Sequence, residues 1–379
     1  MQSTHQLIME DARRMPAVKD QSVDLVVTSP PYPMIEMWDR VFSETDPAIE
    51  KALARSEGNL AFDLMHQQLD AVWGEIARVV KPGGITCINI GDATRSLKGH
   101  FQLFPNHARL ISKFQTLGFS LLPSVIWRKP TNAPTKFMGS GMLPPGAYIT
   151  LEHEHILIFR KGAKRDCSDD LLKQNRRASA YFWEERNVWF SDVWFDLPGA
   201  SQELSPAKIR ERSGAFPFEL PLRLISMFSM KDDRVLDPFL GTGTTLQAAM
   251  CLGRNGLGYE VDPNFQTLIL QKIAAVPDIA NHMISRRLQA HTEFVRARSN
   301  TKADLKYQNR YYGFPVMTRQ EQDLRLEPVQ NVRYLSDDRF QVCYRHLERI
   351  GPPKTSAHAA MSTSKPIPGI AKGHQLKLF

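Results

Sequence analysis

The chain has 379 residues, of which 42% are hydrophobic and 23% charged, the composition of a globular protein with a sizeable core. It contains no apolar run of membrane-spanning length and starts with a polar segment, so we expect neither a membrane anchor nor a signal peptide. The four cysteines lie far apart, in neither disulfide-framework nor zinc spacing, which favours a reducing compartment and predicts a cytoplasmic protein.

Positive charge is concentrated near the C-terminus. Residues 271–379 carry 18 Lys and Arg against 9 Asp and Glu, a net charge of +9, whereas the whole chain carries +8. A basic C-terminal third on a nearly neutral body is suited to contact with a phosphate backbone. A solvated surface that keeps the protein soluble explains the same charge equally well.

In chain order, the first predicted strand is the β-branched run 23–27, which leads into a Ser-Pro-Pro-Tyr tetrapeptide. Because proline has no N–H to donate, the tetrapeptide should lie at the carboxyl end of that strand. Apolar residues at helical spacing predict a helix over 60–80, which Lys-Pro-Gly-Gly at 81–84 should stop. Further strands are predicted over 85–90, 121–127, 155–159, 235–237 and 256–261, and a further helix over 244–252. This alternation predicts an α/β fold with a doubly wound, mostly parallel sheet.

The loop after the strand at 235–237 has features of a nucleotide cradle. It reads Asp237-Pro238-Phe239-Leu240-Gly241-Thr242-Gly243-Thr244-Thr245, and its glycines permit close approach of a ligand to the backbone. Glu260 closes the following predicted strand, where an acidic residue can hold both hydroxyls of a ribose. No Gly-Lys-Ser/Thr follows, which excludes a Walker phosphate loop. Taken alone, the loop is also compatible with a tight turn that binds nothing.

The tetrapeptide Ser29-Pro30-Pro31-Tyr32 has the groups that methylation of a nucleobase amine needs. The amine is a poor nucleophile because its lone pair is delocalised into the ring. A serine hydroxyl and a proline carbonyl can accept its two hydrogens, draw the nitrogen toward tetrahedral geometry and localise the lone pair. The aromatic ring can stack on a base that has been flipped out of the helix. A proline-rich turn without function is the alternative for the tetrapeptide by itself.

Together the two loops resemble the amino-methyltransferase family of DNA-modifying enzymes, in the permuted order in which the catalytic loop precedes the cofactor loop. The resemblance covers roughly residues 7–270 and includes the segments 78–84, 127–130 and 152–159. It implies a Rossmann-like fold, S-adenosyl-L-methionine as cofactor and no metal. The implied catalytic residues are Ser29, Pro30, Pro31 and Tyr32. The implied cofactor-binding residues are Asp11, Phe216, Pro217, Asp237, Pro238, Phe239, Gly241, Gly243, Thr244, Thr245 and Glu260. Ser213-Gly214 stands where the family has a His-Pro pair, which weakens the assignment of that segment.

The target base follows from the same resemblance. In this family the serine form of the catalytic loop is usually associated with N4 of cytosine and the aspartate form with N6 of adenine. We therefore predict a site-specific cytosine-N4 methyltransferase acting on a flipped base in duplex DNA. The alternatives are an adenine-N6 enzyme, a non-catalytic DNA-binding protein on this scaffold and, more remotely, an RNA substrate. Methylation of cytosine C5 needs a thiolate, typically from a Pro-Cys loop, and the chain has no such dipeptide; Cys87 is interpreted as core packing.

The chain is predicted to divide into five segments. They are a catalytic half of the methyltransferase domain (1–161), a candidate target-recognition insert (162–212), a cofactor-binding half (213–275), a basic C-terminal region with possible DNA contact (276–350) and a disordered tail (351–379). In the insert, Trp183, Trp189 and Trp194 are interpreted as core residues. The basic stretch 302–349, with Tyr307, Tyr311, Tyr312 and Tyr344, is an equally good candidate for contact with DNA.

Three further features carry predictions. The C-terminal Gln375-Leu376-Lys377-Leu378-Phe379 resembles the peptide by which bacterial proteins dock on the replication sliding clamp; an apolar end packing on its own domain is the alternative. Met138–Met142, followed by Pro144-Pro145, is either a loop that closes over the base or an ordinary exposed loop. His153 and His155 lie on one face of a predicted strand and are interpreted as structural, since the transfer needs no metal. The predicted partners are double-stranded DNA and, by analogy with the family, a cognate restriction endonuclease.

Overall fold

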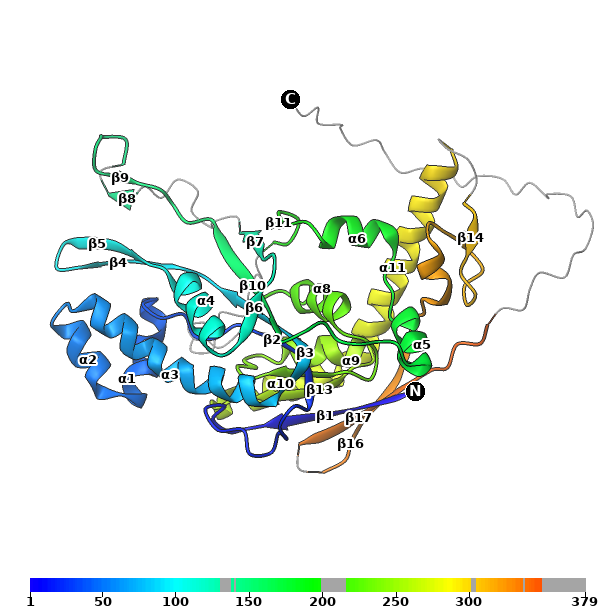
Figure 1. Ribbon diagram of the computed structural model, residues 1–379, viewed down its shortest axis with the longest axis horizontal. Coiled ribbons are helices and arrows are strands. Elements are labelled where there is room, and N and C mark those ends of the chain that lie inside the picture. The colour runs from blue at the N-terminus through cyan, green and yellow to red at the C-terminus, as the bar shows by residue number, and fades with distance from the viewer. Residues whose placement is uncertain (130–137, 140, 199–215, 301–304, 337, 350–379) are drawn as a thin grey trace, which may run out of the picture.

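A computed structural model shows one large sheet with helices packed on both of its faces (Figure 1). The described residues are 1–129, 138–139, 141–198, 216–300, 305–336 and 338–349. The sequence-based prediction of a disordered tail and of the clamp-docking peptide concerns residues outside these ranges, as does Ser213-Gly214. Within the described residues, no helix is long and apolar enough to cross a membrane.

The sheet has 11 strands in the order β11-β7-β10-β3-β2-β12-β13-β1-β17-β16, with β6 paired to β10 off this path. Its centre is a block of five neighbouring parallel strands, which β10 and β17 flank in antiparallel orientation. The strands are β1 Gln2–Ile8, β2 Val23–Thr28, β3 Val80–Ile90, β6 Phe119–Leu121, β7 Val125–Arg128, β10 His153–Lys161, β11 Val193–Trp194, β12 Arg234–Asp237, β13 Asn255–Tyr259, β16 Val329–Tyr334 and β17 Arg339–Tyr344. The predicted α/β class with a doubly wound, mostly parallel sheet is confirmed.

Helices cover the two faces and divide the core into two clusters. One cluster joins the strands to α3 and α4, and the other joins them to α8, α9, α10 and α11. The helices are α1 Asp39–Thr45, α2 Pro47–Ala54, α3 Gly58–Val79, α4 Asn106–Thr116, α5 Asp170–Ala178, α6 Trp183–Trp189, α8 Glu219–Phe228, α9 Thr244–Cys251, α10 Gln266–Ala274 and α11 Val276–Ser299. Successive side chains of the central strands point to opposite faces, so strands covered on both sides read as continuous apolar runs.

The longest helix predicted from sequence, over 60–80, is observed as α3, Gly58–Val79. Its apolar side chains face the sheet, and Trp73 is fully buried there. The Lys-Pro-Gly-Gly segment does end the helix, but its residues already belong to β3, which pairs with β2 through a register irregularity between Val23 and Leu25. Gly83 has φ +79°, a conformation that glycine adopts without steric cost.

Strand β1 was not predicted, because its sequence is polar. Ser3 and His5 are nonetheless buried. The Ser3 hydroxyl lies 2.7 Å from His5 Nε2 and 2.7 Å from the Tyr344 hydroxyl, so internal hydrogen bonds replace water. Burial lowers the pKa of His5 to about 3 and keeps the ring neutral. A search for apolar residues cannot find a strand whose buried side chains are polar and hydrogen-bonded inside the protein.

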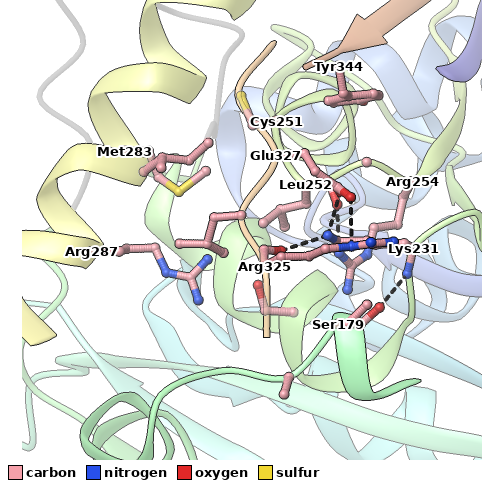
Figure 2. A pocket seen from close by; sticks show the side chains of 16 residues that line it. Ser179, Lys231, Cys251, Leu252, Arg254, Met283, Arg287, Arg325, Glu327 and Tyr344 are labelled. Atoms are coloured by element: carbon pink, nitrogen blue, oxygen red, sulfur yellow. Dashed lines mark hydrogen bonds and ion pairs between the residues drawn. The ribbon is translucent and has the colours of Figure 1, made fainter. Parts of the chain in front are cut away.

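The predicted basic C-terminal region is built into this fold. Strands β16 and β17 extend the sheet beyond β1, and the segment before them packs against α5 through a buried cluster (Figure 2). There Lys231 Nζ pairs with Glu327 Oε2 at 2.5 Å, and both side chains are 6% exposed. Burial lowers the pKa of Lys231 to about 8, which Glu327 partly opposes. Tyr344 is buried with its hydroxyl donating to the Met250 carbonyl, so it is not available to contact DNA.

The predicted insert over 162–212 contributes α5, α6 and the short edge strand β11. Trp189 and Trp194 are buried, which confirms them as core residues, and Trp194 Nε1 donates to the Trp189 carbonyl. Helix α6 is bound to α11 by the ion pair of Arg287 with Glu185 and by the contact of His291 with Glu184. Trp183 is only partly buried, against Phe294 and Arg298 of α11.

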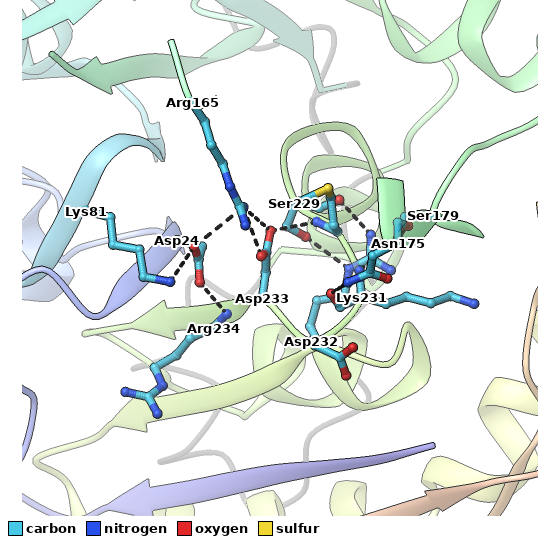
Figure 3. A network of polar contacts seen from close by, with 12 residues as sticks. Asp24, Lys81, Arg165, Asn175, Ser179, Ser229, Lys231, Asp232, Asp233 and Arg234 are labelled. Carbon is cyan, nitrogen blue, oxygen red and sulfur yellow. Dashed lines mark hydrogen bonds and ion pairs between the residues drawn. The ribbon is translucent and has the colours of Figure 1, made fainter. Parts of the chain in front are cut away.

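Ion pairs close the amino-terminal edge of the parallel strands (Figure 3). Asp24, at the start of β2, accepts from Lys81 Nζ at 2.7 Å and from the backbone N–H of Arg234 at 3.0 Å. Arg165 pairs with the neighbouring Asp233 at 2.8 Å. Burial, followed by the charge of Asp24, raises the pKa of Asp233, and Arg165 partly opposes this.

Candidate active site

The opposite, carboxyl-terminal edge collects the predicted site residues. Parallel pairing aligns Val26 of β2 with Leu236 of β12, Asp237 with Gly258 of β13, and Tyr259 with Ile8 of β1. The segments that follow these strands therefore emerge side by side. They carry Ser29–Tyr32 after β2, Pro238–Gly243 after β12, Glu260 after β13 and Asp11 after β1. In open α/β sheets this edge is where ligands bind.

The glycines of the cofactor loop take conformations that other residues rarely adopt. Gly241 has φ +54° and Gly243 has φ +83°, and Gly243 is the N-cap of α9. A Cβ at Gly243 would approach Ile269 to 3.2 Å, whereas a Cβ at Gly241 would meet nothing closer than the Phe239 carbonyl oxygen at 4.0 Å. The loop is thus tightly packed on the α10 side and open at Gly241. Thr244 and Thr245 begin α9 and are buried.

Glu260 holds this loop from the next strand. One of its carboxylate oxygens accepts from the Gly241 N–H at 2.7 Å, and the other accepts from the Asp262 N–H at 2.9 Å. The residue is 9% exposed, and burial raises its pKa to about 7, which the two N–H donors partly oppose. Each oxygen retains acceptor capacity for a second donor.

Asp237 connects the cofactor loop to the catalytic strand. Its Oδ1 accepts from the Thr28 hydroxyl at 2.6 Å and from the Phe239 N–H at 3.0 Å. Asp237 is 1% exposed, and burial raises its pKa to about 6. Because Thr28 directly precedes Ser29, this hydrogen bond sets the position of one loop relative to the other. Phe239 packs its ring against Trp73 of α3.

Lys272, a residue that no motif indicated, supports the loop from α10. Its ammonium group donates to the hydroxyls of Thr242 at 2.7 Å and Thr244 at 2.9 Å. Burial lowers its pKa to about 8. The sequence offered no signal here, since a single lysine in a helix usually lies in solvent.

The remaining predicted cofactor residues lie around this cradle. Asp11 follows β1, and its carboxylate pairs with Arg13 at 2.5 Å. Phe216 and Pro217 lie immediately before α8, and Phe216 is buried in the same apolar cluster as Leu240.

In the catalytic loop, hydrogen bonds hold the Tyr32 hydroxyl in one orientation. It donates to Glu154 Oε2 at 3.0 Å and accepts from Asn89 Nδ2 at 2.8 Å. Ser29 Oγ lies 3.1 Å away, and because the only hydroxyl hydrogen of Tyr32 goes to Glu154, Ser29 must be the donor in this contact. The lone pairs of Ser29 are then available to accept hydrogens from a substrate.

Glu154, on β10, receives three donors. Besides Tyr32, they are Asn89 Nδ2 at 2.6 Å and Lys129 Nζ at 2.5 Å. Burial, followed by the charge of Glu154, raises the pKa of Tyr32 well above its usual value, so the hydroxyl stays protonated. Among the described atoms, Asn89 Oδ1 is buried and has no donor.

Asn89, Lys129 and Glu154 were not identified as site residues. Glu154 was part of a segment that resembles the family, and a charged residue entering an apolar strand was the available signal. Asn89 gave none, because an amide within the strand run Cys-Ile-Asn-Ile has no distinguishing pattern. Only pairing of β3 with β10, Asn89 opposite Ile156, brings these side chains together.

The back of the catalytic loop is packed against backbone and a buried amide. A Cβ at Gly91 would lie 3.0 Å from Tyr32 Cε2, so any larger residue there would have to shift the ring. Asn106 donates to the carbonyls of Pro33 at 3.1 Å and Gly91 at 2.9 Å. Its own Oδ1 accepts from His66 Nε2 at 2.9 Å; burial lowers the pKa of His66 to about 4, so this ring is neutral.

His155 does lie near other potential metal ligands, which sequence spacing did not reveal. Asp92, His107 and His155 offer ligand atoms within 4.8 Å of one another. However, the two rings stack with centroids 4.1 Å apart and planes 21° apart, and Asp92 accepts from His107 Nδ1 at 2.7 Å. Stacked rings do not direct their nitrogens toward a common point. The group is therefore interpreted as two stacked histidine rings, one of which is hydrogen-bonded to Asp92.

The edge defines a class of protein: an α/β enzyme with a nucleotide-type cradle beside a loop that can accept hydrogens from an amine. The comparisons agree. The family model for DNA methylases matches residues 23–271. The chain is 51% identical to the type II methyltransferase M.MthZI of Methanothermobacter thermautotrophicus, over 92% of this chain and 97% of that protein. It is 50% identical to the type II methyltransferase M.MjaI of Methanocaldococcus jannaschii, over 72% and 91%.

Among solved structures, a protein of Thermus thermophilus described as a putative DNA modification methylase, in complex with S-adenosyl-L-methionine, is 33% identical. The match covers 72% of this chain and 95% of that one, with a TM-score of 0.55. The chain belongs to the N6/N4 DNA methylase family and is a DNA methyltransferase.

Proposed function

We propose that this protein transfers a methyl group from S-adenosyl-L-methionine to N4 of a cytosine that has been flipped out of duplex DNA. The observation that carries the proposal is the Ser29 hydroxyl, whose hydrogen is committed to Tyr32 and whose lone pairs are available, at the same sheet edge as the cofactor cradle. The residues Ser29, Pro30, Pro31 and Tyr32 are the proposed catalytic group.

The cradle fits the cofactor in chemistry and in space. Glu260 presents two oxygens that already accept backbone N–H groups and can accept ribose hydroxyls as well. The loop leaves room at Gly241, where a Cβ would meet nothing closer than the Phe239 carbonyl oxygen at 4.0 Å. Asp11 and Phe216 are proposed to contact the cofactor from the two sides of this loop. When bound, S-adenosyl-L-methionine supplies an electrophilic methyl group on a sulfonium.

Ser29 and Pro30 act on the amine. The serine hydroxyl and the proline carbonyl accept its two hydrogens, which localises the lone pair of the nitrogen for attack. Tyr32 stacks on the base, and its ring is held by Gly91 behind it and by Asn89 and Glu154 at the hydroxyl.

The proton that the amine loses has a path along the same hydrogen bonds. It passes to Ser29 Oγ as the serine proton moves to Tyr32 and the tyrosine proton moves to Glu154, which is an anion paired with Lys129. One C–N bond forms, one C–S bond breaks, and the proton ends on a carboxylate from which solvent removes it. Glu154 is thus a positioning residue for Tyr32 and the proton acceptor at the end of the chain.

The choice of cytosine rests on the serine. Cytosine N4 and adenine N6 are the same kind of amine, and the chemistry described above serves either. The serine form of the loop, usually associated with cytosine in this family, favours N4. Single-molecule sequencing of DNA from cells that express the protein or its Ser29→Ala variant tests this. N4-methylcytosine at one recurrent motif, absent with Ser29→Ala, is expected; N6-methyladenine would overturn the choice of base, and no modification by a folded protein would overturn the activity.

The predicted partners remain proposals. The insert over 162–212 and the basic region over 276–350 are alternative candidates for contact with duplex DNA. Docking on a sliding clamp through Gln375–Phe379 requires that deletion of these five residues abolish clamp binding, and an unchanged affinity would end the idea. A cognate restriction endonuclease is expected by analogy with type II systems, which co-expression with the neighbouring gene products would test.

A further inference from the structure

Two β-hairpins project from the catalytic side of the sheet (Figure 1). One is formed by β4 Ala93–Leu97 and β5 His100–Phe104, and the other by β8 Met138–Gly139 and β9 Ala147–Tyr148. They contact each other through Phe101 and Tyr148, whose rings stack with centroids 4.3 Å apart and planes 20° apart. Neither hairpin is part of the main sheet.

The loop of the second hairpin, between β8 and β9, exposes two consecutive large apolar side chains: Met142 is 84% exposed and Leu143 is 71% exposed. Tyr148 and Ile149 are also exposed, at the opposite end of this hairpin. On the neighbouring hairpin, Leu103 is exposed as well. A contiguous set of exposed apolar side chains on a protein surface usually marks a site of interaction.

Both hairpins are attached directly to the residues that hold Tyr32. The strand β4 begins two residues after Gly91, against which the Tyr32 ring packs. The strand β9 ends six residues before Glu154, which accepts the hydrogen of the Tyr32 hydroxyl. A flipped base that stacks on Tyr32 therefore leaves its duplex next to these hairpins.

Their charges fit a nucleic acid. Residues 93–104 contain Arg95, Lys98 and His100 and no acidic residue, and Arg95 is paired with Asp39 of α1. Residues 138–151 contain no charged residue at all. An apolar tip beside a basic, acid-free hairpin resembles the arrangement in which cations contact phosphates and an apolar wedge enters the base stack.

We propose that the tip formed by Met142 and Leu143 inserts into duplex DNA beside the target base and stabilises the flipped state. This inference rests on the proposed action on a flipped base. Flipping costs the stacking and pairing of one base, which is a few kcal/mol. An apolar side chain that fills the vacated space regains part of this free energy by leaving water and by contacting the neighbouring bases. Duplex DNA is thus the proposed ligand of the exposed apolar tip.

The test compares wild type with Met142→Ser/Leu143→Ser on duplexes that contain the motif found by sequencing and carry 2-aminopurine directly beside the target cytosine. Leu121→Ser/Leu270→Ser is the matched control, since it removes two exposed leucines outside the segments that are proposed to contact DNA. We expect the wedge variant to bind the paired duplex about ten-fold more weakly and to give a smaller fluorescence increase, because the base unstacks less often. On a duplex with a mismatched target, where less pairing has to be broken, the difference should fall to about two-fold.

Equal binding and equal fluorescence of the wedge variant and wild type on the paired duplex would overturn the proposal. A loss of the same size on paired and mismatched duplexes would also overturn it, since that is general DNA or protein contact rather than insertion. Methylation of the same duplexes is measured in parallel. If wild type modifies no duplex, the proposed function fails, while the affinity comparison still decides the role of the tip.

Discussion

The two ends of the parallel strands are built from similar residues and treat their carboxylates differently. At the amino-terminal edge, Asp24 and Asp233 are paired with Lys81 and Arg165. At the carboxyl-terminal edge, Asp237 and Glu260 take their hydrogen bonds from a hydroxyl and backbone N–H groups, and burial raises their pKa values to about 6 and about 7. At one edge the buried carboxylates are paired with cations. At the other they accept only hydroxyl and backbone N–H groups, and Glu260 is the acceptor that we propose the cofactor uses.

The largest expected effect is at Glu154. Glu154→Gln keeps an acceptor but removes the charge, which leaves Lys129 without its counter-ion and the proton path without its acceptor. We expect the single-turnover rate of methylation to fall about 100-fold, with affinity for S-adenosyl-L-methionine unchanged. Glu152→Gln is the control: Glu152 lies directly before β10, is half-buried and pairs with Arg128, and its variant should retain activity. Equal rates for both variants would remove Glu154 from the mechanism.

The next largest effect is expected from a substitution at the amino-terminal edge of the parallel strands. Asp24→Asn leaves Lys81 and Arg165, both partly exposed, without this carboxylate, and should lower the free energy of unfolding by about 2 kcal/mol. Denaturant unfolding measures this. Affinity for the cofactor and the single-turnover rate should stay within about two-fold of wild type. A variant of normal stability that methylates poorly would contradict the division of labour between the two edges.

Cofactor binding should depend on the ionisation of Glu260. The pKa of the free protein's Glu260, about 7, lies above that of the unfolded chain, so this group stabilises the ligand-free fold most at low pH and less as pH rises through 7. The ribose hydroxyls donate to the ionised carboxylate of Glu260. The affinity for the cofactor should therefore increase with pH, whereas the contribution of Glu260 to the stability of the ligand-free fold decreases with pH. We expect the affinity to fall about ten-fold between pH 8 and pH 6 by calorimetry. Glu260→Gln should bind weakly with a flat profile, and a flat profile in wild type would rule out this role.

The smallest effect concerns the packing behind Tyr32. Gly91→Ala places a methyl group 3.0 Å from the ring and should displace it. We expect the methylation rate to fall about five-fold while cofactor affinity holds, a displacement that costs about 1 kcal/mol. Gly74→Ala, at an exposed position of α3 where a Cβ meets nothing within 4 Å, should leave the rate unchanged and slightly raise the melting temperature. Unaltered methylation by Gly91→Ala would show that Tyr32 tolerates movement.

The sequence alone was enough to predict the parts of the candidate site that directly follow strands. Ser29–Tyr32 and the loop with Gly241 and Gly243 were predictable because prolines and glycines constrain the backbone locally. The parallel strands then bring both loops to one edge, as the alternation of strands and helices predicts. Helix α3 was predicted from its periodicity to within two residues at its start.

What the sequence did not reveal depends on contacts between distant strands. Asn89 and Glu154 meet because β3 and β10 pair in antiparallel orientation, and neither residue has a local signature. The polar strand β1 was hidden because Ser3 and His5 are buried through hydrogen bonds to each other and to Tyr344. Similarly, the basic charge near the C-terminus did not show that β16 and β17 extend the sheet.

The central claim is that Ser29 directs methyl transfer to cytosine N4. The most direct measurement is mass spectrometry of nucleosides from unmethylated DNA incubated with the purified protein and S-adenosyl-L-methionine that carries a deuterated methyl group. The account predicts deuterated N4-methyldeoxycytidine with wild type and its loss with Ser29→Ala, which still binds the cofactor. Deuterated N6-methyldeoxyadenosine from wild type, or undiminished N4-methyldeoxycytidine from Ser29→Ala, would contradict it.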